Sequence, residues 1–294
     1  MRSAAIIIGA GPAGIAAAIQ LKRYGLEPLL LEKARVGGLL WNANWVENYP
    51  GFPNGVTGPK LIALMEKQMQ RLGVKVTRGE ALRVDCEGDG FVVETRETTY
   101  KINVVVVATG TKPHPIPNVV AENAHDRVFS EVRPLLEARE KRIVVVGAGD
   151  AAFDYALNLS KMRNSVPILN RGGAVKCLQL LFERAARDPN ITCRARMSVR
   201  RVEADETAGR LKVQCEAEGM NESLEADYVL FAVGREPNLD FLSEDVRRRE
   251  RELVEAGRLY FVGDVKNGLF RQTAIAAGDG LRAAIQIYAD MEKR

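Results

Sequence analysis

The stretch Ala4–Lys33, AAIIIGAGPAGIAAAIQLKRYGLEPLLLEK, decides the fold. Ala4–Ile8 is a short apolar run of the kind that forms a buried parallel strand. A glycine-rich turn and an alanine-rich segment follow it, and a second apolar run, Pro28–Leu31, ends at Glu32. The order strand, glycine turn, helix, strand predicts a βαβ unit of a parallel α/β sheet.

The turn carries the spacing G-x-G-x-x-G at Gly9, Gly11 and Gly14. The first glycine permits a tight turn, the second leaves room for a pyrophosphate, and the third lets the helix pack close to the strand. Phosphates would bind the free backbone N–H groups at the helix N-terminus. Glu32, 18 residues after Gly14, offers a carboxylate to the ribose hydroxyls. Together these features predict a dinucleotide-binding unit.

Composition places the chain among soluble globular proteins. It has 294 residues, of which 46% are hydrophobic and 27% charged, enough for two domains. No apolar run reaches the ~20 residues of a membrane span, and the first strand begins too early for a signal peptide. The net charge of +4 is too small to indicate nucleic acid, but it favours an acidic protein partner. We therefore expect a cytoplasmic protein that binds neither membranes nor nucleic acid.

Cysteine and histidine are scarce. Only His114 and His125 are present, so a histidine-based metal site or catalytic triad is not expected. No two cysteines form C-x-x-C and none has metal-ligand spacing, which predicts reduced thiols and no metal. The four cysteines are Cys86, Cys177, Cys193 and Cys215.

The opening pattern returns in the second half of the chain. Ile143–Val146 reads as a strand, Gly147–Ala152 is G-x-G-x-x-A, and a helix and the strand Val166–Leu169 follow. Asn170 ends that strand 23 residues after the first glycine, the same distance as in the opening copy. Such self-similarity indicates two copies of one dinucleotide-binding unit.

Each copy continues in the same way. Short alternating segments within residues 81–102 and 198–227 predict two small antiparallel meanders. Each meander is followed by an apolar strand, Val104–Val107 or Tyr228–Ala232, that runs into a glycine-containing end. These ends are Ala108-Thr109-Gly110 in the first copy and Val233-Gly234 in the second.

One linker precedes the second copy and another follows it. Thr111–Asn118 contains three prolines, and Arg235–Asn238 returns the chain after the second copy. The remainder, one strand, Gly263-Asp264 and a helix, is too short for a core of its own. We therefore expect residues 1–113 and 239–294 to form an FAD-binding domain and 114–238 an inserted NAD(P)-binding domain. The predicted fold is α/β, with two Rossmann-like dinucleotide-binding domains, the second inserted in the first, each with a small antiparallel meander.

Two nucleotide sites in one chain indicate electron transfer between cofactors, because a flavin accepts hydride from a nicotinamide. Glu32 suits a dinucleotide with a free ribose 2′-hydroxyl, such as FAD. The second copy has Asn170 in place of the acid, and Arg171 and Lys176 bring positive charge. Cations there bind a 2′-phosphate, which favours NADPH over NADH.

Several of these features also have a purely structural interpretation. Arg171 is also compatible with an ordinary surface position, and Asp264 with a cap of the last helix. The glycine- and tryptophan-containing loop Val36–Pro53 either covers a flat ring system or fills a gap under the chain. The basic run Arg247–Arg251 is read as a solvated helix face rather than a docking patch.

The motifs together resemble the thioredoxin reductase family of two-domain flavoproteins. The resemblance implies FAD in the first domain, a nicotinamide nucleotide in the inserted domain, a homodimer, and often a domain rotation during turnover. It covers nearly the whole chain and rests on Gly9–Gly14, Glu32, Gly37-Gly38, Val46–Phe52, Ala108–Gly110, Gly147–Ala152, Gly263-Asp264 and Arg271-Gln272.

Sequence and resemblance together define two sets of expected site residues. By position, the resemblance places Asn48 and Arg271–Thr273 near the isoalloxazine. The expected FAD set is Gly9, Gly11, Pro12, Ala13, Gly14, Glu32, Lys33, Gly38, Leu39, Asn48, Ala81, Ala108, Thr109, Gly110, Gly263, Asp264, Arg271, Gln272 and Thr273. The expected NADP set is Gly147, Gly149, Asp150, Ala151, Asn170, Arg171, Lys176, Val233 and Gly234.

The sequence departs from the family at its redox centre. Thioredoxin reductases carry C-x-x-C shortly before the second glycine motif, where this chain reads RVFSEVRP over Arg127–Pro134. The cysteine pair that glutathione-reductase relatives carry after the first acidic residue is also missing. The branch without these pairs resembles ferredoxin–NADP reductases of the thioredoxin-reductase type, which commonly have an acid like Asp150. The basic pattern is incomplete as well, because Gly172 stands where the family has a second arginine.

The resulting prediction is an FAD-dependent oxidoreductase that moves electrons between NADPH and an external acceptor, a ferredoxin-like or other small redox protein. No internal disulfide and no catalytic side chain take part, because hydride transfer rests on positioning the nicotinamide against the flavin. The alternative is a flavin-binding regulatory or interaction protein, non-catalytic or driven by ferredoxin. The missing cysteines favour that alternative, and the intact second glycine turn favours the enzyme.

Overall fold

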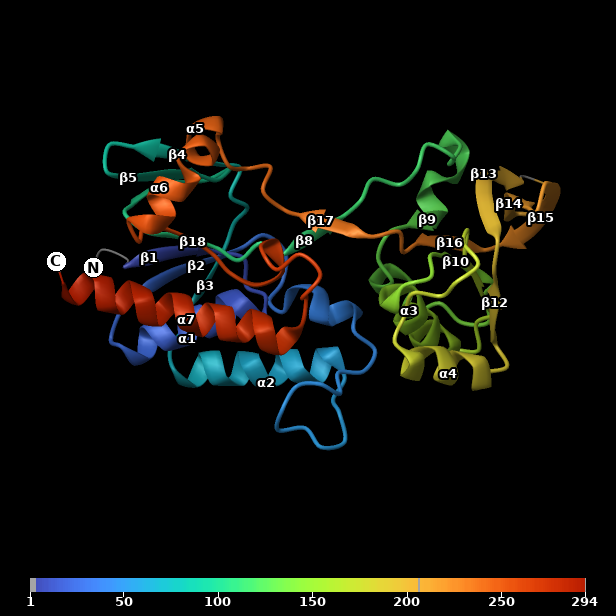
Figure 1. Cartoon of the computed structure of the whole chain (residues 1–294), viewed down its shortest axis with the longest axis horizontal. Helices are drawn as coiled ribbons and strands as arrows, with labels where there is room; N and C mark the ends of the chain where they lie inside the picture. Colours follow the sequence, from blue (N-terminus) through green and yellow to red (C-terminus); the bar gives the residue numbers. More distant parts are fainter. Residues whose placement is uncertain (1–3, 206, 294) are drawn as a thin grey trace. The chain divides into compact units, whose positions relative to one another are not determined.

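The structure, a computed structural model, describes residues 4–205 and 207–293. It has the predicted α/β class: two five-stranded parallel sheets and two three-stranded antiparallel meanders (Figure 1). The chain forms two compact units. The first takes in the described residues up to Trp41, Val46–Lys112 and those from Glu236 onward, and the second takes in Asn42–Trp45 and Pro113–Arg235.

The sheet of the first unit has the order β18-β7-β1-β2-β3. Its central strand is buried along its whole length, as expected of a continuous apolar run. The last strand in sequence, β18, follows the second unit along the chain and pairs with β7. The bounds are β1 Ala5–Ile8, β2 Pro28–Glu32, β3 Val76–Arg78, β7 Val105–Val107 and β18 Leu259–Phe261.

Alternating side chains of β1 build a core on each face of this sheet. Ala5 and Ile7 pack under three helices, which lie side by side in Figure 1: α1 (Pro12–Arg23), α2 (Gly58–Arg71) and α7 (Thr273–Glu292). Ile6 and Ile8 pack on the other face, against the meander and two short helices. Those elements are β4 Arg83–Glu87, β5 Gly90–Glu94, β6 Thr99–Ile102, α5 Glu244–Arg248 and α6 Glu250–Glu255.

The second unit repeats this plan with the order β12-β11-β10-β16-β9. Helices α3 (Asp150–Ser160) and α4 (Gln179–Arg187) contribute to one core, and the meander contributes to the other. The strands are β9 Val128–Phe129, β10 Ile143–Val146, β11 Val166–Leu169, β12 Ile191–Arg194 and β16 Tyr228–Phe231, and the meander is β13 Met197–Asp205, β14 Arg210–Ala217 and β15 Met220–Ala226.

The two segments expected to be linkers each contain a short strand. Part of each forms a two-stranded sheet, β8 (Thr111–Pro113) with β17 (Arg235–Pro237). Each strand ends at a proline, which has no N–H to continue the ladder. Pairing between segments far apart in sequence leaves no local signal.

Short 3-10 helices connect several of these elements: η1 Gly38–Asn42, η2 Glu122–Arg127, η3 Arg133–Leu135 and η4 Gly263–Val265. Among residues 4–205 and 207–293, no helix combines the length and apolarity needed to span a bilayer.

Candidate functional site

The first glycine turn lies at the carboxyl end of β1. Gly9 has φ +105°, and a β-carbon there would stand 2.5 Å from the carbonyl oxygen of Ala108. A β-carbon on Gly14 would stand 1.9 Å from the carbonyl oxygen of Gly9. At Gly11, by contrast, no such atom lies within 4 Å. The fold itself therefore requires glycine at 9 and 14, whereas Gly11 faces open space that suits a pyrophosphate.

Glu32 ends β2 beside this turn. One carboxylate oxygen accepts the N–H of Ala10 at 2.8 Å, and the other accepts the N–H of Ala34 at 2.9 Å. Each carboxylate oxygen has a second lone pair, so the group can still accept hydrogen bonds. The two backbone contacts thus fix the carboxylate beside the glycine turn, where it can accept further hydrogen bonds.

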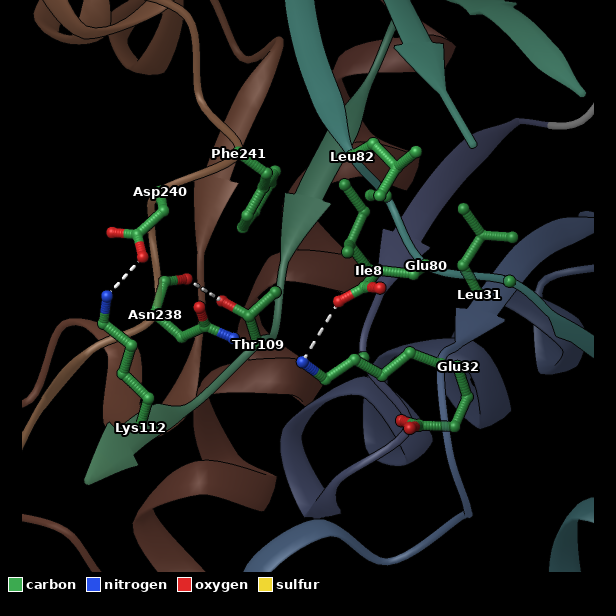
Figure 2. Close-up of a pocket in the computed structure, with 14 residues that line it drawn as sticks. Ile8, Leu31, Glu32, Glu80, Leu82, Thr109, Lys112, Asn238, Asp240 and Phe241 are labelled. Atoms are coloured by element: carbon green, nitrogen blue, oxygen red, sulfur yellow. Dashed lines mark hydrogen bonds and ion pairs between the residues drawn. The ribbon is translucent and has the colours of Figure 1, made fainter. Parts of the chain in front are cut away.

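A cavity of about 470 Å³ opens at this place (Figure 2). Lys33 pairs with Glu80 at 3.3 Å, and Lys112 pairs with Asp240. The mixed polar and apolar lining of the cavity suits the nucleoside part of a dinucleotide. The lining residues are Ile8, Gly9, Leu31, Glu32, Lys33, Gly79, Glu80, Ala81, Leu82, Thr109, Lys112, Asn238, Asp240 and Phe241.

Nine of the fourteen lining residues were not among the expected site residues. The Thr109 hydroxyl donates to the carbonyl oxygen of Asn238 at 2.7 Å, which ties the end of β7 to the segment after β17. No motif marks that segment, because it reaches the cavity only through tertiary structure. The residues not expected at the site are Ile8, Leu31, Gly79, Glu80, Leu82, Lys112, Asn238, Asp240 and Phe241.

The loop carrying Asp264 is held by a carboxylate that the sequence did not indicate. Asp279 of α7 accepts the backbone N–H of Gly263 at 3.2 Å and the side-chain amide of Asn267 at 2.7 Å. It also pairs with Lys266 at 3.4 Å. These contacts fix the loop that presents Asp264 between β18 and α7.

Other expected FAD residues are also brought into contact. The Asn48 amide donates to Oε1 of Gln272 at 2.7 Å, joining the predicted aromatic loop to the start of α7. A β-carbon on Gly38 would lie 3.4 Å from the Cα of Gly11. The rest lie on the same elements: Pro12 and Ala13 open α1, Leu39 is in η1, Gly110 follows β7, Arg271 precedes α7 and Thr273 begins it.

The second glycine turn repeats the first within its own unit. A β-carbon on Gly147, with φ +145°, would stand 2.4 Å from the carbonyl oxygen of Ala232, the counterpart of the contact between Gly9 and Ala108. Gly149 precedes the first residue of α3, Asp150. Ala152 replaces the third glycine and is fully buried. This unit therefore repeats the geometry of the first glycine turn, with alanine in place of the third glycine under the helix.

The segment 170–178 is tied to this turn. Asn170 is 5% exposed, and its side chain donates to the carbonyl oxygen of Ala174 at 3.0 Å and accepts from Gly172 N–H at 2.9 Å. Asp150 accepts the N–H of Leu178 at 2.8 Å. The side chains of Asn170 and Asp150 thus stabilise the conformation of this loop.

Two basic side chains project from this fixed segment. Arg171 and Lys176 are exposed, and the N–H of Lys176 donates to the carbonyl oxygen of Ala148 at 2.9 Å. Ala151 is an exposed residue of the first turn of α3, and Val233 and Gly234 follow β16. The expected nicotinamide-nucleotide residues therefore gather around one end of this sheet.

All four cysteines are free thiols. Burial raises the pKa of Cys86, Cys177, Cys193 and Cys215, the last to about 11. A thiol with a raised pKa stays protonated at neutral pH and is a weak nucleophile.

The segment Arg127–Pro134, where the family resemblance expects a dithiol, has other contacts. Glu131 pairs with Arg235 at 3.0 Å, and Val132 is fully buried. The segment thus carries an ion pair and an apolar anchor in this position.

The sequence profile of the family "Pyridine nucleotide-disulphide oxidoreductase" matches residues 3–280. The chain belongs to this family. Within it, the thioredoxin reductases of Streptomyces coelicolor and Chlamydia pneumoniae are each 30% identical to the chain, covering 95% and 97% of it and 91% and 97% of their own lengths. The crystal structure of Lactococcus lactis thioredoxin reductase matches with a TM-score of 0.89 at 26% identity, with full coverage of both chains. The chain is a thioredoxin reductase-like flavin oxidoreductase, and the cofactors of its family are FAD and NADPH.

Proposed function

We propose that this chain transfers electrons between NADPH, bound by the second unit, and an external acceptor, through FAD bound by the first unit and without an internal redox disulfide. The observation that carries the proposal is the pair of matching glycine turns, each seated on the end of a neighbouring strand. Neither turn has lost its geometry, which supports two working nucleotide sites.

The residues of the first unit fit FAD. Open space at Gly11 and the free backbone N–H groups at the start of α1 suit the pyrophosphate, and Glu32 suits the ribose. Asp264 and the linked pair Asn48 and Gln272 are assigned to the ribityl chain and the ring system. When bound, FAD supplies the two-electron chemistry, and the protein supplies binding and orientation.

The residues of the second unit fit NADPH. The N-terminus of α3 at Gly149 and Asp150 offers backbone N–H groups to a pyrophosphate. Arg171 and Lys176 supply charge for a 2′-phosphate, and the bonds of Asn170 hold their loop in shape. NADPH is accordingly the preferred nucleotide.

The acceptor is assigned outside the chain because the C-x-x-C pair of the family is missing from the sequence. Arg127–Pro134 contains no cysteine, and burial raises the pKa of the four thiols present. The net charge of +4 favours a small acidic redox protein of the ferredoxin type as the partner. A cytoplasmic homodimer is the proposed working form.

A cysteine-free variant tests the missing relay. Cys86→Ser, Cys177→Ser and Cys193→Ser are combined with Cys215→Ala, because Cys215 is 1% exposed in an apolar core. We expect the folded variant to retain most of the wild-type rate of NADPH-dependent reduction of ferredoxin or a dye. We expect neither the variant nor the wild type to reduce thioredoxin disulfide. Loss of turnover in a variant with unchanged circular dichroism and flavin content would contradict the proposal.

A further inference from the structure

A third basic side chain lies at the edge of the sheet that carries Arg171. Strands β11 and β12 are parallel neighbours, and Leu169 at the end of one pairs with Arg194 at the end of the other. Arg171 lies two residues beyond Leu169, and Arg196 lies two residues beyond Arg194. Ligands of open α/β sheets bind outside the carboxyl ends of the strands. The register therefore brings Arg196 to the same level as Arg171.

Direct contacts place Arg196 against the loop itself. Its backbone N–H donates to the carbonyl oxygen of Gly172 at 2.9 Å. A β-carbon built on Gly173 would stand 3.8 Å from Nε of Arg196, so the guanidinium lies beside a stretch of the loop that has no side chains. Gly172 stands where the family resemblance expects an arginine. The neighbouring strand thus brings a cation to the place where the loop lacks one.

We infer that Arg196 is a third cation of the 2′-phosphate site, acting with Arg171 and Lys176 to select NADPH over NADH. The inference rests on the proposed NADPH site of the second unit. An arginine has a planar fork of donors that matches the geometry of a phosphate. The loop beside Arg196 is held by the side-chain hydrogen bonds of Asn170 and by the hydrogen bond from the N–H of Leu178 to Asp150. Arg171 and Lys176 lie on this loop, and Arg196 follows the neighbouring strand β12.

Glu218 competes with the nucleotide for this side chain. Its Oε1 accepts from Nη1 of Arg196 at 2.6 Å, and both side chains are well exposed. Exposed ion pairs contribute little, and a phosphate carries a charge of about −2, so the phosphate is the stronger partner. Removing the carboxylate charge should therefore improve the binding of a 2′-phosphate.

A neighbouring ion pair provides a matched control. Arg200 pairs with Glu216 at 2.7 Å on the same meander, and its side chain is 61% exposed, close to the 68% of Arg196. Among the described residues, none of the hydrogen bonds and ion pairs given above links Arg200 to the loop of residues 170–178. A role for Arg196 that is confined to the surface charge of the meander would be shared by Arg200.

The test measures binding of 2′,5′-ADP and of 5′-AMP to the flavin-loaded protein by isothermal titration calorimetry. Arg196→Ala should weaken 2′,5′-ADP by about 3- to 10-fold, between the effect of an exposed ion pair and that of a desolvated charge-assisted hydrogen bond. Binding of 5′-AMP should not change. Arg200→Ala should change neither, Arg196→Lys should recover part of the loss, and Glu218→Gln should strengthen binding of 2′,5′-ADP alone.

Two results would overturn the inference in different ways. If wild type binds 2′,5′-ADP more tightly than 5′-AMP but Arg196→Ala behaves like Arg200→Ala, Arg196 is not part of the site and the proposed NADPH site stands. If wild type does not distinguish the two nucleotides, both the inference and the assignment of NADPH to this loop are wrong.

Discussion

Gly9, Gly11 and Gly14 belong to one motif, but the structure constrains them differently. A side chain at Gly9 or Gly14 would meet the backbone within 2.5 Å or less, whereas Gly11 has open space around it. The backbone of Gly11 is extended, with φ −76° and ψ −178°, a conformation that any residue adopts. The fold therefore requires the first and third glycines, whereas only the proposed pyrophosphate accounts for the second.

This difference predicts opposite outcomes for two substitutions. Gly11→Val should leave the apoprotein as stable as wild-type apoprotein while abolishing FAD binding, because the side chain fills the place of the pyrophosphate. Gly9→Ala should destabilise the protein by about 2–4 kcal/mol through overpacking and a strained φ. Thermal unfolding of the apoproteins and the flavin content after reconstitution measure both effects. Retention of FAD by Gly11→Val would contradict the assignment.

Asp154 on α3 gives the stability of the second unit a pH dependence. Burial raises the pKa of its carboxyl to about 6, Lys161 acts in the opposite direction, and Asp150 adds to the rise. The usual value in an unfolded chain is about 3.9. Because the folded state holds this proton more tightly, the contribution of Asp154 is most favourable below about pH 4 and is lost as the pH rises to about 6.

Asp154→Asn removes this ionisation. The amide oxygen can still accept the N–H of Asn44, which donates to Asp154 at 3.0 Å. A shift of two pKa units corresponds to about 2–3 kcal/mol, so the variant should be more stable than wild type at pH 7 by up to that amount and not at pH 4. Urea unfolding of both proteins across this range measures the difference, in which other titrating groups cancel. A difference that does not vary with pH would contradict this account.

At the scale of elements, helices α1 and α7 of the first unit approach each other closely at Gly280. A β-carbon on Gly280 would stand 2.0 Å from the carbonyl oxygen of Ala13 and 3.0 Å from the N of Ala17. Gly278, two residues earlier on α7, is exposed and has nothing within 4 Å of the same position. One glycine allows the two helices to approach, and the other does not contribute to their packing.

Alanine at these two glycines should act in opposite directions. Gly280→Ala should lower the free energy of unfolding by about 2 kcal/mol or more, because the helices must separate to admit a methyl group. Gly278→Ala should raise it by up to about 1 kcal/mol, the gain in helix propensity. Denaturant unfolding decides between them, and a stabilising Gly280→Ala would show that the crossing is loose.

Elements with a local signal could be predicted, and elements that depend on distant partners could not. The bounds of β10 and β11, Ile143–Val146 and Val166–Leu169, agree with the expected strands, since buried parallel strands are continuous apolar runs. Edge strand β12 has two exposed side chains among its four residues and was not expected. The pairing of β8 with β17 and the contacts of Asp279 bring together distant segments, which no local pattern indicates.

The candidate site follows the same rule. The residues of the two glycine turns and the strand-end Glu32 were predicted because their chemistry requires fixed spacing. The cavity is also lined by Asn238, Asp240 and Phe241, which belong to no motif. Their segment reaches the site only through the tertiary fold. The internal repeat supplied the plan of the whole molecule, because the second unit repeats the first.

For the molecule as a whole, the central claim is that electrons pass from NADPH to FAD and leave without an internal dithiol. An anaerobic titration of the flavin-loaded protein with NADPH tests it most directly, followed by flavin absorbance. We predict complete bleaching with one NADPH per FAD, since one hydride carries the two electrons that the flavin takes up, and slower bleaching with NADH. Consumption of two NADPH per FAD would reveal a second redox centre, and a flavin that NADPH leaves oxidised would show that the second unit is not a working nicotinamide site.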